Sequence, residues 1–419
     1  MPPPPSAVTA PVAASPPLLG VNSPPGEAVR HIGAAALMLN VGHSIDHLML
    51  LIFATAVGAI AADFGIARWE DLMPYAAGAF VLFGLGSLPA GRLGDHWGRR
   101  AMMLVFFFGI GVSSLLVAAV QGPWQLAGAL TLMGAFSAIY HPVGIPMLVQ
   151  GTLRPGAVIG VNGLAGNLGI AAAALSTGFL VKYFGWRAAF VVPGVVAIGC
   201  GIVFARVAPH EATPPSRRAP RELDLPPGVI ARALLVVTLT STCASLIFNF
   251  TTNGNGEFLR ERMAEITRDP ALLGALLAAV YVIASFAQVI VGRAIDRYPL
   301  KRLYFAIVLV QIPLFLLATH AEGWTLYTLA VVYMAFVFGA IPFTDAIVVR
   351  YVDDRMRSRV AGIRLTVSFG IASLAVYLLG PLVKAAGFTT LLLILAAIST
   401  ATAAAVLLLP AERRVASPD

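Results

Sequence analysis

Three ionisable side chains stand close together in an apolar stretch near the start of the chain. They are His43, Asp46 and His47, in the segment Gly42-His43-Ser44-Ile45-Asp46-His47. Residues three and four apart share one face of a helix, so a helix would present all three to the same neighbours. Imidazole exchanges protons near neutral pH, with an ordinary pKa of about 6.5. A carboxylate beside two imidazoles therefore indicates a proton relay.

Two other interpretations of these residues stay open. The side chains could form a packed polar knot that is hydrogen-bonded between helices and has no chemical role. Alternatively, His43 and His47 could ligate a metal, with Asp46 between them, Met49 nearby and His141 as a third ligand. Any two residues four apart on a helix align, so this spacing alone is not diagnostic. We predict neither a cofactor nor a resident metal.

A second polar group falls in another apolar stretch, where Tyr140 and His141 precede Pro142 in the segment Gly134-Ala135-Phe136-Ser137-Ala138-Ile139-Tyr140-His141-Pro142. Proline removes a backbone donor and loosens the hydrogen bonding of the preceding helical turn. A histidine at such a break can reach a cavity, where it would contact substrate or transfer a proton. The alternative is that His141 only bonds a freed backbone carbonyl.

Two further candidates occupy matching places in the two halves of the chain. Gly160-Val161-Asn162 corresponds to Gly362-Ile363-Arg364, just as Pro142 corresponds to Pro342. Arg364 either extends to the membrane surface or faces inward, where it would bind a carboxylate or phosphonate in bidentate fashion. Other polar residues could line the substrate path or simply form interhelical hydrogen bonds; they are Asn167, Asn249 and Asn253.

Composition places all of these residues in a membrane. Hydrophobic residues make up 58% of the 419 residues and charged residues 11%, against about 45–50% and about 25% in soluble domains. Twelve apolar stretches each approach the ~20 residues that cross ~30 Å of hydrocarbon as a helix. We predict spans at 31–62, 71–91, 101–120, 124–150, 156–181, 187–207, 228–254, 270–291, 303–319, 324–350, 360–381 and 387–410.

The first cluster then lies deep in the first span. Counted from residue 31, His43 and His47 are ~18–24 Å along the helix at 1.5 Å per residue, near the middle of the membrane. Ionisable groups at that depth cost ~2.5–3.5 kcal/mol on insertion scales and normally face a cavity. The cluster is therefore a candidate for function.

Basic residues give the orientation. The net charge of +8 is carried in short turns, so it does not indicate a nucleic-acid partner. Of the 28 Lys and Arg residues, 21 fall on the side of both termini, which the positive-inside rule identifies as cytoplasmic. We expect a multi-pass inner-membrane protein with both ends in the cytoplasm. The other seven are Arg68, Lys182, Arg187, Arg260, Arg262, Arg268 and Lys384.

Proline-rich segments divide the chain. Nine of the first 29 residues are proline and no apolar core is present, so we do not predict a signal peptide. We predict a disordered cytoplasmic tail at 1–30, an N-terminal six-helix bundle at 31–207, a cytoplasmic linker at 208–227, a C-terminal six-helix bundle at 228–410 and a tail at 411–419. Cys200 and Cys243 fall in spans, as small apolar fillers.

A hydrophilic turn follows the second span of each half. The copies read Gly91-Arg92-Leu93-Gly94-Asp95-His96-Trp97-Gly98-Arg99-Arg100 and Gly292-Arg293-Ala294-Ile295-Asp296-Arg297-Tyr298-Pro299-Leu300-Lys301-Arg302. Such a repeat in an apolar chain indicates a transporter with two similar halves. The candidate gate residues are Gly91, Asp95, Gly98, Arg99, Arg100 and Asp296.

With twelve spans and a central loop, Gly91-x-x-x-Asp95-x-x-Gly98-Arg99-Arg100 resembles the loop motif of the major facilitator superfamily, over residues 31–410. The resemblance implies two six-helix bundles, a central cavity and alternating access. It also implies that Asp95 braces the loop against the start of the eleventh helix and locks the cytoplasmic gate. A carboxylate beside a helix N-terminus is worth ~0.3–1 kcal/mol. The alternative is that these charges only mark topology.

The histidine motifs are similar to those of the fosmidomycin-resistance branch of that superfamily, which pairs Gly-His-x-x-(Asn/Asp) in helix 1 with (Phe/Tyr)-His-Pro in helix 4. This resemblance implies drug/proton antiport. The branch usually has a single His and an Asn-Asp pair in helix 1, whereas this chain has a second His at 47.

We therefore expect a monomeric secondary transporter that moves a small organic solute, with proton-coupled export favoured. No phosphate-binding Gly-x-x-x-x-Gly-Lys-Ser/Thr loop supports ATP-driven transport, and no enzyme signature is present. The alternatives are proton-coupled uptake of an organic anion through Arg364, metal transport, and a membrane sensor that does not transport.

Overall fold

The computed structural model describes residues 25–150, 152, 155–209, 227–351 and 354–410. Side chains are described over the same ranges, except at 25–32, 155–157, 227, 349 and 354–365. Within this part of the chain the secondary structure is helical, without strands. Eleven helical segments of the described chain are long and apolar enough to cross a membrane. The predicted all-α membrane protein is confirmed.

The last helix, α12 (Asp354–Leu407), explains why eleven segments stand where twelve spans were predicted. It runs through two of the predicted spans, 360–381 and 387–410. Gly387 inside it has φ 72 and ψ 172, so the helix breaks and the chain turns at that residue. Glycine adopts positive φ without steric cost. The helix therefore contains two spans.

The N-terminal half contains α1 (Pro25–Asp63), α2 (Ala77–Trp97), α3 (Arg99–Ala119), α4 (Pro123–Ser137), α5 (Ile145–Val149), α6 (Pro155–Phe184) and α7 (Trp186–Val207). Two short 3₁₀ helices, η1 (Trp69–Asp71) and η2 (Met73–Ala76), precede α2, and a π-helix, η3 (Tyr140–Gly144), joins α4 to α5. The C-terminal half contains α8 (Pro227–Arg262), α9 (Pro270–Ile295), α10 (Leu300–Ala318), α11 (Gly323–Tyr351) and α12.

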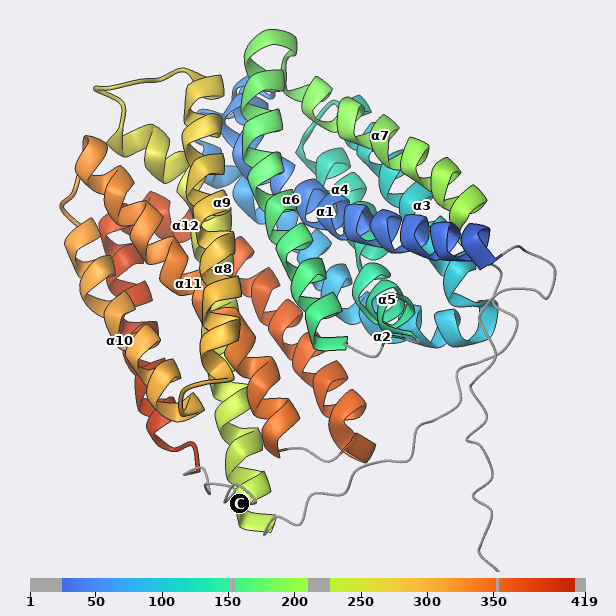
Figure 1. The fold of residues 1–419 in the computed structure, drawn as a ribbon. Coiled ribbons are helices and arrows are strands. Elements are labelled where there is room, and N and C mark those ends of the chain that lie inside the picture. The colour runs from blue at the N-terminus through green and yellow to red at the C-terminus, as the bar shows by residue number, and fades with distance from the viewer. Residues whose placement is uncertain (1–24, 151, 153–154, 210–226, 352–353, 411–419) are drawn as a thin grey trace, which may run out of the picture.

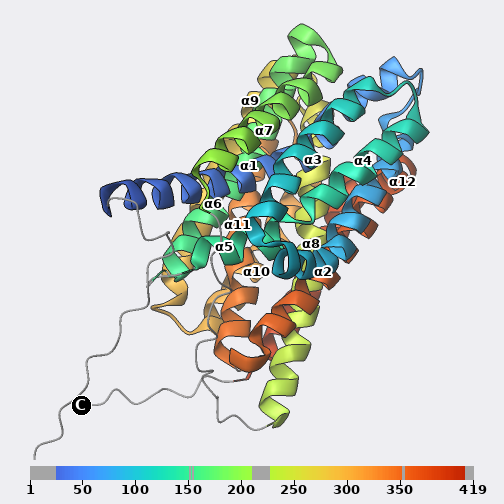
Figure 2. The same ribbon diagram turned by 90° about the vertical axis from the view of Figure 1, so that its right-hand side faces the viewer.

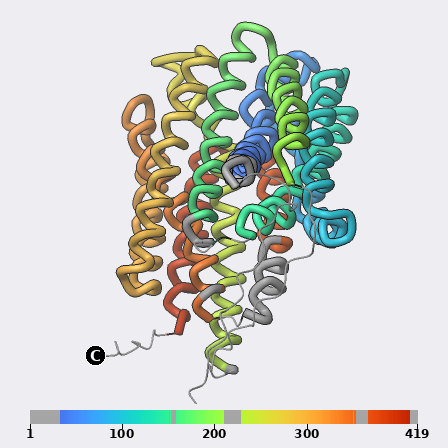
Figure 3. The backbone as a smooth tube through the Cα atoms, turned by 45° about the vertical axis from the view of Figure 1, so that its right-hand side comes forward, coloured from blue at the N-terminus to red at the C-terminus, as the bar shows by residue number. Residues whose placement is uncertain are grey.

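The two halves form two helical bundles that lie side by side. In Figure 1 the blue and green helices of the N-terminal half stand beside the yellow to red helices of the C-terminal half. Figure 2 and the tube in Figure 3 show the same arrangement from other sides. The halves meet mainly where α6 packs on α9 and where α2 packs on α12.

Several boundaries differ from the predicted spans. The second span continues as α2 to Trp97 instead of ending at 91, so most of the predicted Gly91–Arg100 turn is helical. The seventh span continues to Arg262 instead of ending at 254, because Gly254 and Gly256 lie inside α8 with helical geometry. In the fourth span the helix changes at Tyr140 to a single π-helical segment before α5. Pro142 lies in this segment, where the regular α-helical hydrogen bonds are already interrupted.

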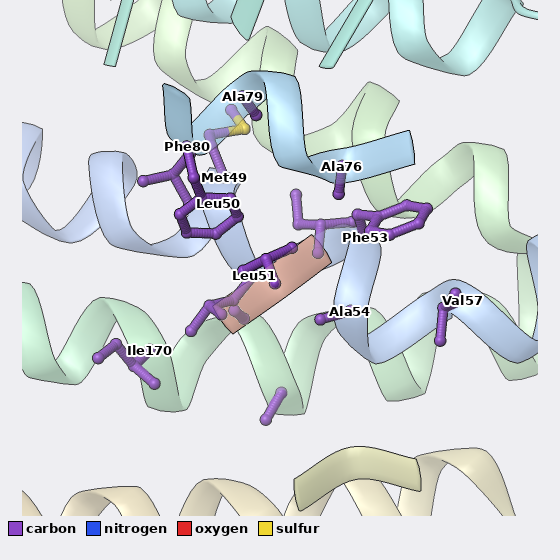
Figure 4. Close-up of a cluster of buried hydrophobic side chains, with 14 of the residues drawn as sticks. Met49, Leu50, Leu51, Phe53, Ala54, Val57, Ala76, Ala79, Phe80 and Ile170 are labelled. Carbon is purple, nitrogen blue, oxygen red and sulfur yellow. The ribbon is translucent and has the colours of Figure 1, made fainter. Parts of the chain in front are cut away.

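Buried apolar side chains bind the helices together. In the N-terminal half, Met49 and Phe53 of α1 pack near Phe80 of α2 and Ile170 of α6, and all are almost fully buried (Figure 4). This core continues into the C-terminal half through residues such as Phe388. A second cluster lies wholly within the C-terminal half. Large apolar side chains also remain exposed on the outside of the helices, as lipid contact requires.

The turn motif that occurs twice in the sequence forms corresponding hydrogen bonds in both halves. Arg100 donates to the carbonyl oxygens of Ala205 and Ala208 at 2.5 and 3.0 Å, at the end of α7. Lys301 does the same at the end of α12, with the carbonyl oxygens of Leu407 and Leu409 at 2.6 and 2.9 Å. Each turn motif therefore supplies a cation to the last carbonyls of the final helix in its own half.

A second repeated bond joins the first and fifth spans of each half. The Ser44 hydroxyl donates to the Ala165 carbonyl at 2.7 Å, and the Ser245 hydroxyl donates to the Ser368 carbonyl at 2.6 Å. Ser44 and Ser245 are 201 positions apart, which aligns α1 with α8 residue by residue.

The turn between α2 and α3 explains one residue of the motif. Gly98 alone connects the two helices, and it adopts φ 88. An L-residue with a side chain is strained in that region. In the second copy Pro299 stands at this place, and the connection between α9 and α10 is longer.

Glycines also set how closely the helices cross. A Cβ added to Gly169 of α6 would lie 2.1 Å from the Ser44 carbonyl oxygen of α1. No side chain fits there without moving one of the helices.

We predict that Gly169→Ala lowers the apparent unfolding temperature of the purified protein, because overpacking a tight contact costs ~1–3 kcal/mol. Gly199→Ala is the matched control, since no atom outside its own helix lies within 4 Å of the added carbon. Thermal unfolding in detergent measures both. Equal stability of the two variants would contradict the close crossing.

Candidate functional site

Three imidazoles meet where α1 faces the π-helix η3. His43 and His47 come from α1 and His141 from η3, and ring nitrogens of all three lie within 4.8 Å of one another. The Nε2 atoms of His43 and His47 are 3.1 Å apart. The structure therefore brings together the histidines of the two sequence segments, as the sequence analysis expected.

Asp46 lies beside the imidazoles and is completely buried. Its Oδ2 atom is 3.7 Å from Nε2 of His141. Neither carboxyl oxygen has a hydrogen-bond partner among the described residues. Ser137 is close enough to interact with the carboxyl, but the geometry falls short of a hydrogen bond. A buried carboxyl group is thus held next to a histidine with few other polar partners.

The His43 ring is oriented from both sides. Its Nδ1 lies 2.7 Å from the carbonyl oxygen of Asn162. A carbonyl oxygen only accepts, so Nδ1 carries the proton and the Nε2 lone pair of neutral His43 points toward His47. Tyr140 stacks on the opposite side of the ring, with centroids 4.7 Å apart and planes 14° apart.

A second layer of hydrogen bonds holds these partners. The Asn162 amide donates to the Tyr140 hydroxyl at 2.7 Å and to the side-chain oxygen of Asn40 at 3.0 Å. The Tyr140 hydroxyl donates to the Leu39 carbonyl at 2.8 Å. Tyr140 and Asn162, two of the predicted site residues, therefore lie beside the cluster. Asn40 was not singled out from the sequence, although its place three residues before His43 puts it on the same face.

Gly166 is the other participant that sequence reasoning missed. A Cβ at this position would lie between 2.7 and 2.9 Å from three atoms of the His43 ring. The imidazole therefore occupies the space that a side chain on α6 would fill. A lone glycine in an apolar helix gives no sequence signal of this kind.

The cluster reaches the boundary between the halves through aromatic contacts. His141 has Phe83 of α2 and Phe369 of α12 around it, with ring centroids 5.8 and 5.4 Å away. Phe83 and Phe369 also contact each other at 4.2 Å. A movement of one bundle against the other would change the surroundings of His141.

The positions of the C-terminal half that match this cluster carry apolar residues. With the 201-residue offset of the serine pair, the residues matching His43, Asp46 and His47 are Ala244, Ile247 and Phe248. With the 200-residue offset of Pro142 and Pro342, the residue matching His141 is Ile341. The fold forms the second half with apolar side chains at these places, so packing does not require the polar cluster.

The other predicted site residues lie elsewhere. Asn167 of α6 hydrogen-bonds Gln288 of α9 across the two halves. Asn249 and Asn253 donate to the carbonyls of Ser245 and Asn249, one turn back in their own helix, at 2.9 and 3.0 Å. The Arg364 side chain lies outside the described residues, so its predicted role stays a prediction.

The predicted gate residues surround the turn between α2 and α3. Asp95 is exposed in the last turn of α2, and Asp296 is exposed at the end of α9. Arg99 donates to the side-chain oxygen of Gln150 at 3.3 Å, while Arg100 binds the end of α7. The start of the eleventh span, against which Asp95 is expected to brace, lies among side chains outside the description.

The opposite end of the molecule, which we call the distal face, is formed by connections such as residues 184–185 and 263–269, at the top of Figure 1. Two ion pairs cross between the halves there. Lys182 of α6 pairs with Asp269, and Asp71 of η1 pairs with Lys384 of α12. The hydrogen bond from Lys182 lowers the pKa of Asp269 below its usual range.

A buried carboxylate adds to this contact. Glu257 of α8 is bound by Arg260, and its Oε1 would lie only 2.9 Å from a Cβ on Gly58 of α1. Together with the ion pairs, this close fit holds the two halves against each other at the distal face.

Comparison with known proteins gives the class. Residues 39–255 and 258–419 match the family model of the Major Facilitator Superfamily. The chain therefore belongs to this superfamily of transporters.

Among curated relatives, the chain is 27% identical over 238 residues to a puromycin resistance protein of Streptomyces alboniger, covering 56% of this chain and 42% of that protein. It is 29% identical over 184 residues to a probable actinorhodin transporter of Streptomyces coelicolor, covering 41% and 31%. The matched region thus spans less than half the length of these relatives.

A solved structure confirms the fold. A bacterial homolog of the human lysosomal transporter Spinster, in an inward-facing and unoccupied conformation, superimposes with a TM-score of 0.67. The alignment covers 93% of this chain and 95% of that chain at 14% sequence identity.

We predict that Lys182→Glu loosens the distal face, because it places two like charges together where the halves meet. A cysteine at Ala174, buried where α6 crosses α9, should then react faster with a maleimide. The double variant Lys182→Glu/Asp269→Lys should restore slow labelling. The control is Arg187→Glu, whose partner Asp63 belongs to the same half.

The labelling is measured on purified protein in which Cys200 and Cys243 have been replaced. If Arg187→Glu accelerates labelling as much as Lys182→Glu, the ion pair between the halves does not hold the distal face closed.

Proposed function

We propose that the chain is a proton-coupled exporter of a small organic solute, working by alternating access in the inner membrane with both termini in the cytoplasm. Membership of the transporter superfamily supports the class. Export is supported by the relatives, which include a puromycin resistance protein and a tetracenomycin C resistance and export protein.

The buried Asp46–His141 contact carries the proposal for the coupling ion. An ionised carboxylate deep in a membrane protein is costly unless a charge or water compensates it. In the conformation described, Asp46 is removed from solvent, and Nε2 of His141 lies 3.7 Å from its Oδ2. A proton on this pair therefore favours the buried arrangement, and release of the proton favours a conformation in which Asp46 is hydrated.

This difference couples protonation to conformation. A ligand shifts a two-state equilibrium only by its difference in affinity for the two states. The proton meets this condition because Asp46 lies beside His141. His141 in turn lies beside Phe83 and Phe369, which contact each other across the boundary between the halves. His43 and His47 extend the relay from His141, and Tyr140 and Asn162 hold His43 in its orientation.

The surroundings of the cluster favour an organic solute with apolar surface. Phe83 and Phe369 lie next to His141 from the two halves, and aromatic faces bind flat or cationic organic groups. Uptake of an anion would need Arg364 as the fixed positive charge and is the alternative. The resistance and export proteins among the relatives favour export.

We predict that Asp46→Asn abolishes gradient-driven transport while substrate exchange without a gradient continues. The amide keeps the shape of the carboxyl group but cannot release a proton. Substrate is first identified by thermal shift with a panel that includes puromycin, phosphonates and organic acids. Transport is then measured in vesicles with an imposed pH gradient.

The matched control is Asp63→Asn, the same substitution at the distal end of the same helix, where the carboxylate pairs with Arg187. It should retain driven transport. Concentration of substrate by Asp46→Asn against its gradient would overturn the coupling assignment.

For Asp95→Ala we expect a different result. If Asp95 locks the cytoplasmic gate, its loss slows the conformational cycle, so driven transport and exchange should fall together. The same measurements on Asp296→Ala, at the corresponding place in the second turn, test whether that copy has the same function. Normal rates in Asp95→Ala would leave its charge as a marker of topology only.

A further inference from the structure

The three imidazoles place nitrogen ligands of the kind that hold a metal ion close together, and the Asp46 carboxyl lies beside one of them, His141. We propose that His43, His47, His141 and Asp46 bind one divalent cation of the zinc class. No observation on transport enters this proposal, so it stands independently of the proposed function, although it uses the same side chains.

The spacing of the donors matches a zinc ion. Zn–N bonds of 2.0–2.1 Å at tetrahedral angles place two nitrogen ligands ~3.3 Å apart. The Nε2 atoms of His43 and His47 are 3.1 Å apart, and His141 brings a nitrogen within 4.8 Å of both. The His43–His47 pair thus has the spacing of two zinc ligands, and His141 places a third nitrogen nearby.

The orientation of His43 fits the same purpose. Because Nδ1 donates to the Asn162 carbonyl at 2.7 Å, the Nε2 lone pair is directed toward His47, the second imidazole of the cluster. Metal-binding histidines nearly always donate their other ring N–H to a carboxylate or a backbone carbonyl, which fixes the tautomer and the ring. Gly166 leaves the space in which this ring sits.

Asp46 supplies the fourth donor and the negative charge. Both of its oxygens are buried without a hydrogen-bond partner among the described residues, and such a group is expensive unless a cation compensates it. Its Oδ2 lies 3.7 Å from Nε2 of His141, so a cation between them would contact both. A divalent ion accounts for the missing partner of this carboxylate.

The ligand types favour particular metals, and two of the side chains are partly exposed, which leaves a path for an ion. Imidazole donors favour zinc, nickel and copper, whereas magnesium and calcium prefer oxygen ligands. The cluster is not sealed, since the His141 side chain is 13% exposed and His47 is also partly exposed. The ion would join α1 to η3 within the N-terminal half.

The test is zinc binding to purified, untagged full-length protein in detergent, after removal of metal with a chelator. Equilibrium dialysis with metal analysis should give one tightly bound zinc per chain, unaffected by excess magnesium. His43→Gln, His47→Gln and His141→Gln should each weaken binding by ~100-fold or more, beyond the 10–100-fold effect of losing an outer-shell partner.

His96→Gln and His320→Gln are the controls, because both histidines lie outside the cluster, and both variants should bind as the unchanged protein does. X-ray absorption at the zinc edge of the unchanged protein tests the site without any variant, and should show three nitrogen ligands at 2.0–2.1 Å and a carboxylate oxygen.

Two results would overturn the proposal. One is the absence of saturable zinc binding, and the other is binding that persists when all three histidines are replaced. Neither result depends on a transport measurement. A protein that binds zinc without proton-coupled transport would support only the metal site, and a protein with proton-coupled transport but no zinc binding would support only the proposed function.

Discussion

The geometry of the histidine cluster depends on how closely α1 and α6 cross. Gly169 lets the α6 backbone approach the Ser44 carbonyl, and the Ser44 hydroxyl in turn bonds the Ala165 carbonyl. At that separation the His43 ring reaches the Asn162 carbonyl, over the space left by Gly166. A wider crossing would remove the partner that fixes the His43 tautomer. The contacts of His47 and His141 with that ring would then change as well.

The two halves share hydrogen bonds to the backbone and differ in the side chains around those bonds. Hydrocarbon offers no hydrogen-bond partners, so each span forms a helix that satisfies its own backbone groups. Polar side chains inside the spans need specific partners from neighbouring helices. Ser44 and Ser245 form the same bond in both halves. Around Ser44 the chain carries two imidazoles and a carboxyl, whereas around Ser245 it carries apolar residues. The two halves therefore have corresponding backbone contacts, while the histidine cluster belongs to the N-terminal half.

Much of the fold could be predicted from the sequence because its signals are local. Span length, the Gly91–Arg100 turn and the spacing of His43, Asp46 and His47 depend only on neighbouring residues. The last two spans follow the same rule, because α12 breaks at Gly387, where the sequence predicted the second of them to begin. Gly166 and Asn40 were missed because their importance arises between helices, where a single sequence gives no contact information. The roles of Arg364 and Asp95 stay predictions.

The pair of cations at the ends of α7 and α12 has a consequence for how the protein is made. Arg100 and Lys301 each join the start of the third span of a half to the end of its sixth. Each half can therefore close its own ring of helices with its own residues. During synthesis the first six spans leave the ribosome before the last six exist, and they already contain the complete histidine cluster. The polar side chains that are most costly to expose to lipid are thus made together, and His141 gains its contact with Phe369 once the second half follows.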